Sequence, residues 1–304
     1  MLQKIIKYIK NKINKQEKTS REEIISASMK RHWSELKARG YDVAALFLQG
    51  SQNYGLDEYT DEYCSDVDTK AIVIPSFKDF VYDKEPVSTT IILDNNEHID
   101  VKDIRIMFEM FRKENISYIE LLYTKYKIVN PKYKRYIDQV CEKRESVAAH
   151  NTNQFVRCIA GMSMEKRKAL CHPYPNLIDK IEKYGFDGKQ LSHCVRLNDF
   201  LYKYVNGCCI ADCFDANNKQ ELMNYKKQLV KDGSRVMTKE EAIELCAATD
   251  QATAALKDMV VNSHEEKVDY GVIEFLNGIK YDILKKKFKE DIWLARKRWE
   301  EKQS

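Results

Sequence analysis

Short apolar runs separated by polar turns occupy the first part of the chain. The runs are residues 43–48, 70–74, 87–93 and 98–102. Runs of this length, bounded by turn-forming residues, predict strands of a sheet. The first run stops at Gly50-Ser51 and the second at Pro75, and the polar turn at 94–96 joins the last two into a hairpin. A small sheet is therefore expected near the N-terminus.

Helical periodicity dominates the rest of the chain. Ser20 followed three residues later by Glu23 is a capping box, so a helix is expected to begin there and to end before Gly40. Further helices are expected over residues 104–123 with a break near Asn115, and over 131–146, 150–171, 176–184, 188–206, 218–231, 238–262 and 272–302. The predicted fold class is α+β, a mixed α/β domain followed by an all-helical domain. The expected boundaries are 1–19 for a basic N-terminal helix, 20–130 for the sheet domain and 131–304 for the helical domain.

Composition narrows the class of protein. Hydrophobic residues make up 43% of the 304, which supports a real core, and no apolar run reaches the length of a membrane span. The N-terminus lacks the continuous apolar stretch and the cleavage site of a secretory signal. Nine scattered cysteines, an odd number, favour a reduced, cytoplasmic compartment. Neither a Walker-type G-x-x-x-x-G-K-S/T motif nor a G-x-G-x-x-G dinucleotide motif is present, so P-loop and Rossmann interpretations are excluded.

Charge is distributed unevenly along the chain. Residues 1–39 carry eleven Lys/Arg against four Glu, and residues 280–304 carry nine Lys/Arg against five Asp/Glu. Since the whole chain has a net charge of +4, these balances of +7 and +4 leave −7 for the body. Two basic ends can contact a nucleic-acid backbone, although such ends are more often solvated helix faces.

Two carboxylates stand directly before the second predicted strand. Asp66 and Asp68 are two residues apart, so both point to one face while Val67 points into the packing. Like charges at the mouth of a sheet repel each other, and a divalent cation that prefers oxygen ligands, Mg²⁺ or Mn²⁺, relieves this. The Gly50-Ser51 turn offers backbone N–H groups and a hydroxyl, which suit a phosphate. An ordinary hairpin with solvated aspartates is the alternative.

These residues belong to a longer pattern. Its members are Gly50, Ser51, Tyr54, Gly55, Leu56, Ser65, Asp66 and Asp68. The pattern resembles the GS-x-x-YGL…SD-x-D motif of polymerase-β-like nucleotidyltransferases, in particular the small bacterial and phage ones often encoded near RNA ligases. The resemblance extends over about residues 43–260 and leaves the basic ends outside. Fourteen residues separate Ser51 from Asp66, a few more than is usual, and Ser117 stands where a proline is common.

The resemblance implies the transfer of a nucleoside monophosphate from a nucleoside triphosphate, ATP favoured, to an acceptor, with release of pyrophosphate. Asp66 and Asp68 would hold two Mg²⁺ or Mn²⁺ ions, and Gly50 and Ser51 would bind the terminal phosphates. A third carboxylate is implied on the fourth predicted strand.

The strand pattern offers three candidates for that carboxylate. Asp100 alternates with Ile99 and Val101, so it would face the same side as the aspartate pair. Asp100 is preferred, and Glu97 and Asp103 are the alternatives.

A polar stripe on a later helix extends the resemblance. Lys189, His193 and Arg196 stand at i, i+4 and i+7 and are similar to the family's K-x-x-x-H-x-x-R-L segment, which implies a contact with the triphosphate. A solvated helix face is the alternative for all three.

Three further interpretations stay open or are disfavoured. Tyr54, Tyr59 and Tyr63 around the turn either stack on a base or cover the sheet edge. A zinc site is disfavoured because the spacing of the cysteines is not C-x-x-C. Its members would be His193, Cys194, Cys208, Cys209 and Cys213.

The acceptor is less defined than the chemistry. An RNA end is favoured by the basic termini and by the family's association with RNA ligases. A protein side chain or a small molecule is the alternative acceptor, and a non-catalytic nucleotide- or RNA-binding module is the alternative class, disfavoured by the intact aspartate pair.

The basic N-terminal segment gives a first prediction. Deleting residues 1–15 should weaken RNA binding and leave triphosphate binding intact, because the segment supplies lysines for phosphate contacts. Binding of a labelled RNA, measured across a salt series, checks this. RNA affinity that is unchanged by the deletion and insensitive to salt would rule out a phosphate-contact role.

Overall fold

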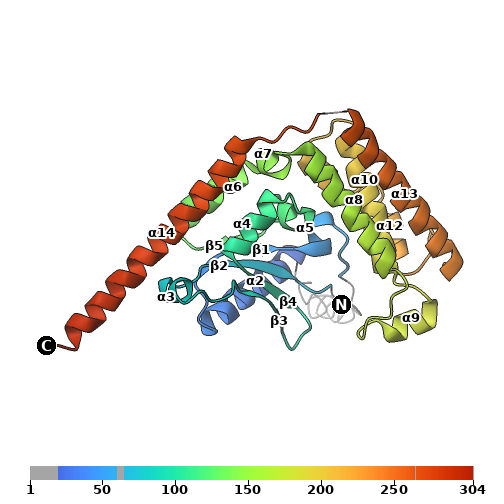
Figure 1. The fold of residues 1–304 in the computed structure, drawn as a ribbon. Coiled ribbons are helices and arrows are strands. Elements are labelled where there is room, and N and C mark those ends of the chain that lie inside the picture. Colours follow the sequence, from blue (N-terminus) through green and yellow to red (C-terminus); the bar gives the residue numbers. More distant parts are fainter. Residues whose placement is uncertain (1–19, 60–64, 264, 304) are drawn as a thin grey trace, which may run out of the picture.

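The computed structural model describes residues 20–59, 65–263 and 265–303. A small sheet lies under an inverted V of helices, one arm of which is a single long helix and the other a helical bundle (Figure 1). The predicted basic helix at 1–19 lies outside the described residues. The α+β class is confirmed.

The elements follow one another along the chain in two groups. The sheet region comprises α2 (Arg21–Ala38), β1 (Val43–Leu48), η1 (Gly50–Tyr54), β2 (Thr69–Val73), α3 (Phe77–Val81), β3 (Ser88–Ile92), β4 (His98–Asp103), α4 (Ile104–Arg112), α5 (Ile116–Ile119), η2 (Glu120–Leu122) and β5 (Lys127–Val129). The later helices are α6 (Lys134–Glu142), α7 (Arg144–Ala148), α8 (Thr152–Ala169), α9 (Ile178–Tyr184), α10 (Gly188–Val205), α11 (Ile210–Phe214), α12 (Lys219–Lys226), α13 (Lys239–Ser263) and α14 (Tyr270–Glu301).

Within the described residues, five strands form one mixed sheet in the order β3-β4-β2-β1-β5. β1 pairs antiparallel with β2 and β5, and β3 pairs antiparallel with β4 as the predicted hairpin. β2 and β4 run parallel, with Lys70 opposite Asp100. Neighbouring parallel strands present opposed residues on the same face, so β4 extends the face that carries Asp68.

The two faces of the sheet enter different hydrophobic clusters. One cluster joins α2 to the sheet through Ile25, Met29, Leu36, Leu46, Leu48, Ala71, Val73, Ile99 and Val101. The other runs from Phe47 and Ile72 through α4 and α5 into the later helices, as far as Ile283 of α14. The helical part is thus fixed to the sheet by a continuous core. The proposed boundary between residues 130 and 131 stays a prediction.

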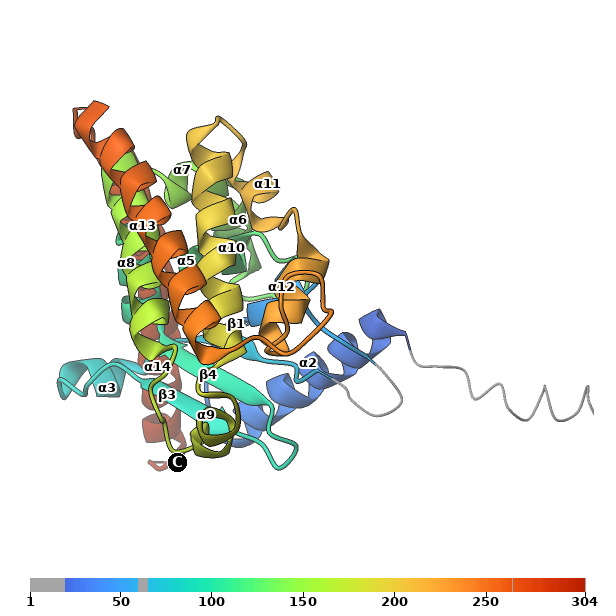
Figure 2. The ribbon, with the colours of Figure 1, turned by 90° about the vertical axis from the view of Figure 1, so that its right-hand side faces the viewer.

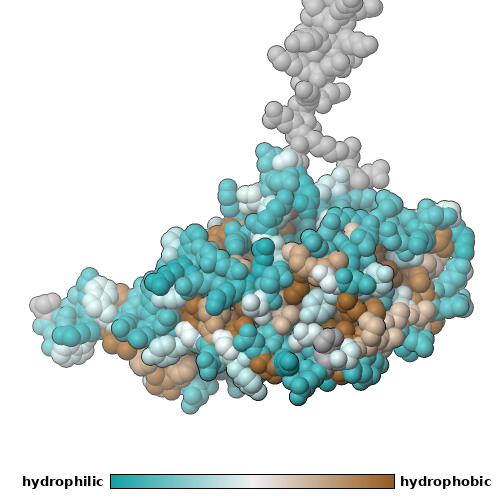
Figure 3. All heavy atoms as spheres, turned by 90° about the horizontal axis from the view of Figure 1, so that it is seen from above, coloured by the Kyte–Doolittle hydropathy of each residue, from teal (hydrophilic) through white to brown (hydrophobic). Residues whose placement is uncertain are grey.

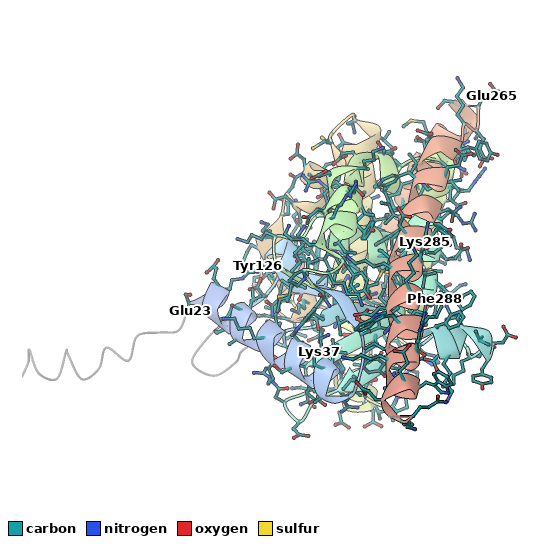
Figure 4. The ribbon with its side chains drawn as sticks, turned by 90° about the vertical axis from the view of Figure 1, so that its left-hand side faces the viewer. Glu23, Lys37, Tyr126, Glu265, Lys285 and Phe288 are labelled. Atoms are coloured by element: carbon teal, nitrogen blue, oxygen red, sulfur yellow. The ribbon has the colours of Figure 1, made fainter. Side chains whose placement is uncertain are left out.

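The later helices take two positions above the sheet. α8, α10 and α13 pack against one another, and α12 packs on α10 beside the end of the sheet (Figure 2). α14 packs on α4, α3 and α6. Phe288 of α14 contacts Phe77 and Phe80 of α3, each at a ring distance of 5.3 Å (Figure 4). Beyond this contact the end of α14 projects from the body (Figures 1 and 3).

Most predicted elements are confirmed. The Ser20–Glu23 capping box is present, and the helix break near Asn115 separates α4 from α5. Two short elements escaped prediction, β5 and α11, because three to five residues are too few to show a period. The helix expected over 218–231 ends at Lys226. In the described part of the chain, no helix is both long and apolar enough to cross a bilayer.

A buried polar network fastens α2 to the sheet. Glu97 precedes β4 and accepts hydrogen bonds from Ser28 at 2.9 Å and from Arg31, and it lies 2.9 Å from His32 Nε2. The other ring nitrogen of His32 lies 2.8 Å from Thr69. Burial raises the pKa of Glu97, but hydrogen bonds from His32, Asn95, Arg31 and Ser28 outweigh it and lower the pKa from 4.5 to about 2.

Replacing Glu97 by Gln should therefore destabilise the fold and remove part of its acid sensitivity. A carboxyl whose folded pKa is depressed contributes stability above its unfolded pKa and loses it as the pH falls from about 4.5 towards 2. We expect a loss of roughly 2 kcal/mol at neutral pH, after allowance for solvent screening. Urea unfolding of parent and variant between pH 2 and 7 measures this.

The matched control is Glu35→Gln on the same helix. Glu35 pairs with Arg39 at the surface, so its replacement should change the free energy of unfolding by less than about 0.5 kcal/mol. Parallel pH curves for the parent and Glu97→Gln would contradict the role assigned to this network.

Candidate active site

The turn after β1 is a short 3-10 helix that opens and closes on glycine. Gly50 has φ +81° and Gly55 has φ +67°, both in the left-handed region that side chains disfavour. The backbone therefore reverses sharply at Gly50. Its N–H donates to Glu120 Oε1 at 3.2 Å, and the Ser51 side chain is left facing the cleft described below.

Side chains of the turn hold it against its surroundings. Gln52 Nε2 donates to the backbone oxygen of Asp66 at 2.7 Å, and the Tyr59 hydroxyl donates to Gln52 Oε1 at 2.9 Å. Asn53 donates to the backbone oxygen of Leu48 at 2.9 Å. The turn is thus tied both to the end of β1 and to the segment that carries the aspartates.

The structure brings Asp66 and Asp68 together at the N-terminal end of β2. Val67 between them is fully buried, as expected for the opposite face. Asp68 Oδ1 accepts a hydrogen bond from the backbone N–H of His98 at 3.0 Å and lies 3.1 Å from its Nδ1. Burial raises the pKa of Asp66, and the negative charge of Asp68 raises it further. A raised pKa of this origin marks a pair of carboxylates that a cation would stabilise.

A cleft of about 500 Å³ opens in front of the pair. Its lining comprises Ser51, Glu58, Ser65, Asp66, Asp68, Lys180, Lys189, Met223, Lys226, Lys227 and Gln228. The sheet side supplies the acids and the turn hydroxyl. The helical side supplies four lysines: Lys180 of α9, Lys189 of α10, Lys226 of α12 and Lys227 directly after α12. α12 lies beside this end of the sheet (Figure 2).

Two of these lysines also fasten the helical side to the turn. Lys226 Nζ donates to the backbone oxygen of Leu56 at 3.0 Å, and Lys227 Nζ pairs with Glu58 at 2.8 Å. Burial lowers the pKa of Lys226, and repulsion from Lys189 lowers it further. Cations that repel one another across a cleft favour an anion between them.

The three residues of the predicted helix stripe take different positions. Lys189 is exposed and lines the cleft. Burial lowers the pKa of His193 well below its usual value, and nearby Arg196 and Lys166 lower it further, so this imidazole is neutral. Arg196 is buried against the turn, with its guanidinium 3.8 Å from the centre of the Tyr54 ring. Only Lys189 of the stripe lines the cleft.

The three candidates for a third carboxylate are all engaged elsewhere. Asp100 lies on the same sheet face as Asp68, but it pairs with Lys70 at 3.1 Å and Lys102 at 2.9 Å. Glu97 belongs to the α2 network, and Asp103 caps α4 and pairs with Arg105 at 2.8 Å.

The donor set fits a divalent cation held by two carboxylates. In the part of the chain that the structure describes, no three side chains of His, Cys, Asp or Glu stand close enough to share a metal ion. The disfavoured zinc group is thus not assembled there. A Mg²⁺ ion at Asp66 and Asp68 would complete its coordination with water and phosphate oxygens, as Mg²⁺ commonly does.

Sequence reasoning missed several residues of the site. Lys180, Lys226 and Lys227 carry no motif, and only the docking of α9 and α12 brings them to the cleft. Sequence reasoning also did not identify Glu120 as a candidate residue, because it lies in a mostly apolar segment that is typical of a buried helix. Burial raises the pKa of Glu120 to about 7, while Arg196 lowers it. An acidic residue within an otherwise apolar helix was the available signal.

Two of the tyrosines flanking the turn contact polar neighbours. Tyr54 stacks on Arg196, and Tyr59 donates to Gln52. Tyr63 lies outside the described residues.

The sequence matches no protein-family model and no curated protein. Among solved structures, the chain is similar to a nucleotidyltransferase-like protein from Exiguobacterium sibiricum 255-15. The two are 11% identical, and the alignment covers 78% of this chain and 80% of that one, with a TM-score of 0.30. A similarity at this TM-score carries no argument, so the site is interpreted from its own geometry.

Proposed function

We propose that the protein is a nucleotidyltransferase that moves a nucleoside monophosphate from a nucleoside triphosphate to an acceptor. One observation carries the proposal: Asp66 and Asp68 face a wall of lysines across a single cleft, with Ser51 of the Gly-Ser turn on its lining. A triphosphate and a divalent cation together present the charges that these two sides require.

The reaction that fits is an in-line displacement at the α-phosphorus. An acceptor oxygen forms a bond to that phosphorus, the bond to the bridging oxygen breaks, and pyrophosphate leaves with the electron pair while the acceptor proton passes to solvent. Mg²⁺ or Mn²⁺ at Asp66 and Asp68 would supply charge neutralisation and lower the pKa of the acceptor hydroxyl. Catalysis of this reaction rests on positioning and electrostatics rather than on a protein nucleophile.

The residues of the chain divide these tasks. Asp66 and Asp68 position the cation, and His98 orients Asp68 through its backbone N–H. Ser51 contacts a terminal phosphate, and Lys189, Lys180 and the lysines of the α12 region neutralise the departing pyrophosphate. Asp100 could bind a second ion only after leaving Lys70 and Lys102.

An RNA end is the acceptor that we favour. The projecting part of α14, beyond Phe288, supports it with exposed basic residues at positions 289, 297 and 298. Incubating the purified protein with each α-labelled nucleoside triphosphate, Mg²⁺ and total RNA tests the proposal. Label on RNA supports it fully, label on protein supports transfer to another acceptor, and no label with any nucleotide refutes transfer.

Asp68→Asn should abolish transfer without unfolding the protein. The substitution keeps the shape of the side chain and removes one charge and one strong ligand, so we expect a fall of roughly two to four orders of magnitude in metal-dependent transfer. Mg²⁺ plus triphosphate should raise the Tm of the parent and scarcely move that of the variant. Labelled transfer and thermal melts measure both effects.

Asp94→Asn is the matched control, because Asp94 lies exposed in the turn of the β3–β4 hairpin. It should retain activity and the thermal shift of the parent. Full transfer by Asp68→Asn would show that the metal site is assigned to the wrong residues.

Lys189→Ala should weaken triphosphate binding more than it slows the chemical step. Lys189 is exposed at the cleft wall, so its loss removes a phosphate contact and leaves the core intact. We expect KM for the triphosphate to rise roughly tenfold, the effect of one charge-assisted contact. Steady-state kinetics checks this, with Lys183→Ala on neighbouring α9 as control. An equal effect of both substitutions would indicate only a general loss of positive charge.

A further inference from the structure

A second cavity lies on the other side of the Gly-Ser turn. It has a volume of about 390 Å³ and shares no lining residue with the cleft of Asp66 and Asp68. We call this cavity the Tyr54 pocket. Its lining comprises Arg21, Gln52, Asn53, Tyr54, Gly55, Glu120, Tyr123, Thr124, Lys125, Tyr126, Arg144, Ala211, Phe214, Asp215 and Lys219. The turn stands between the two cavities, and the volume is in the range of small-molecule sites.

Aromatic rings form the walls of the Tyr54 pocket. Tyr54 and Phe214 are nearly parallel, with ring centres 6.1 Å apart, and Tyr123 lies 5.1 Å from Phe214. Tyr126 closes the side next to the N-terminal end of α2, where its hydroxyl lies 3.3 Å from Glu22 (Figure 4). Tyr54 and Phe214 pack on each other and are almost fully buried, whereas Tyr123 and Tyr126 are half-buried and leave ring surface on which a planar base can stack.

Positive charge gathers at the rim. The Arg144 guanidinium lies 5.1 Å from the centre of the Tyr123 ring, and Lys125 Nζ lies 4.9 Å from that of Tyr126. Among the described residues neither Arg144 nor Lys125 has an ion-pair partner, whereas Lys219 pairs with Asp215 at 2.6 Å. Arg144 and Lys125 therefore favour a ligand that carries an anionic group next to a planar ring.

The inner end of the pocket carries a buried acid. Glu120 is 8% exposed, and its Oε1 accepts the N–H of Gly50. Behind Tyr54 lies Arg196, whose Nε and Nη1 have no hydrogen-bond partner in the described structure. A carboxyl group in this position can bond to the edge of a stacked base, and the same group holds the turn that faces the aspartates.

We propose that the Tyr54 pocket binds a nucleotide, with its base among the aromatic rings and its phosphate at Arg144 and Lys125. The bound nucleotide is not the one transferred, because the Gly-Ser turn separates it from Asp66 and Asp68. It is either a free mononucleotide or the terminal nucleotide of a single strand, which share this chemistry. The site does not depend on the proposed transfer activity. A ligand there would contact Glu120 and thereby the Gly50 amide, which couples the two cavities.

Binding in the absence of metal tests the proposal. Fluorescent N-methylanthraniloyl AMP is titrated to millimolar concentration against the full chain in EDTA. The double variant Arg144→Glu/Lys125→Glu changes exposed side chains and should weaken this binding at least roughly tenfold. Lys189→Ala, in the lysine wall of the metal cleft, should leave it unchanged, and so separates this site from that cleft.

A charge-matched control is Arg135→Glu/Lys78→Glu, at two exposed positions away from both cavities. It should bind as the parent does. Equal binding by the pocket variant and the control, or no metal-free binding by the parent, overturns the proposal.

Competition identifies the source of the ligand. AMP and a 5′-phosphorylated tetranucleotide should both displace the probe. Tighter binding of AMP would indicate a free nucleotide as the ligand, and tighter binding of the tetranucleotide would indicate a strand end. Adenosine should displace it poorly because it lacks the phosphate. Adenosine as effective as AMP would overturn the role assigned to Arg144 and Lys125.

Discussion

The hydrogen bond from Gln52 to the backbone of Asp66 is the constraint on which the candidate site depends. The connection between the turn and the aspartates is long, and length alone would leave their separation open. Glu58 and Ser65 close it through paired bonds, with Ser65 N–H donating to Glu58 O and Glu58 N–H to Ser65 Oγ, both at 2.9 Å. The spacing of hydroxyl and carboxylates is then set by these bonds rather than by the number of residues between them.

The opposing lysines depend on the fold in a different way. The helices of the later part of the chain, which carry them, are fixed by the core that runs from Phe47 to α14. Burial lowers the pKa of Lys166, and repulsion from Lys189 lowers it further. Lys166 thus adds to the positive charge near Lys189, and a polyanion bound in the cleft, as proposed, would offset this repulsion.

The alternation of side chains along a strand was sufficient to predict the carboxylates on the sheet side of the candidate site. Alternation along a strand places Asp66 and Asp68 on one face, and no tertiary information is needed. Residues that meet only through helix docking could not be predicted, and Lys180 and Lys226 are of this kind. Arg196 shows the limit of helix periodicity. Spacing of seven residues puts it on the stripe of Lys189, yet two turns further along α10 that face is buried against Tyr54.

The pairing of Lys70 with Asp100 on the sheet face affects how many metal ions the proposed site could hold. Lys70 lies opposite Asp100 in the register, is almost fully buried, and has its ammonium 3.9 Å from the centre of the Tyr118 ring. Burial lowers the pKa of Lys70, and Asp100 opposes that effect. If Asp100 instead bound a second ion, the buried ammonium of Lys70 would lose its carboxylate partner, at a cost of about 3–5 kcal/mol. One ion at Asp66 and Asp68 displaces no such partner. For the proposed metal site, this charge balance favours one divalent ion over two, because Lys70 already pairs with Asp100.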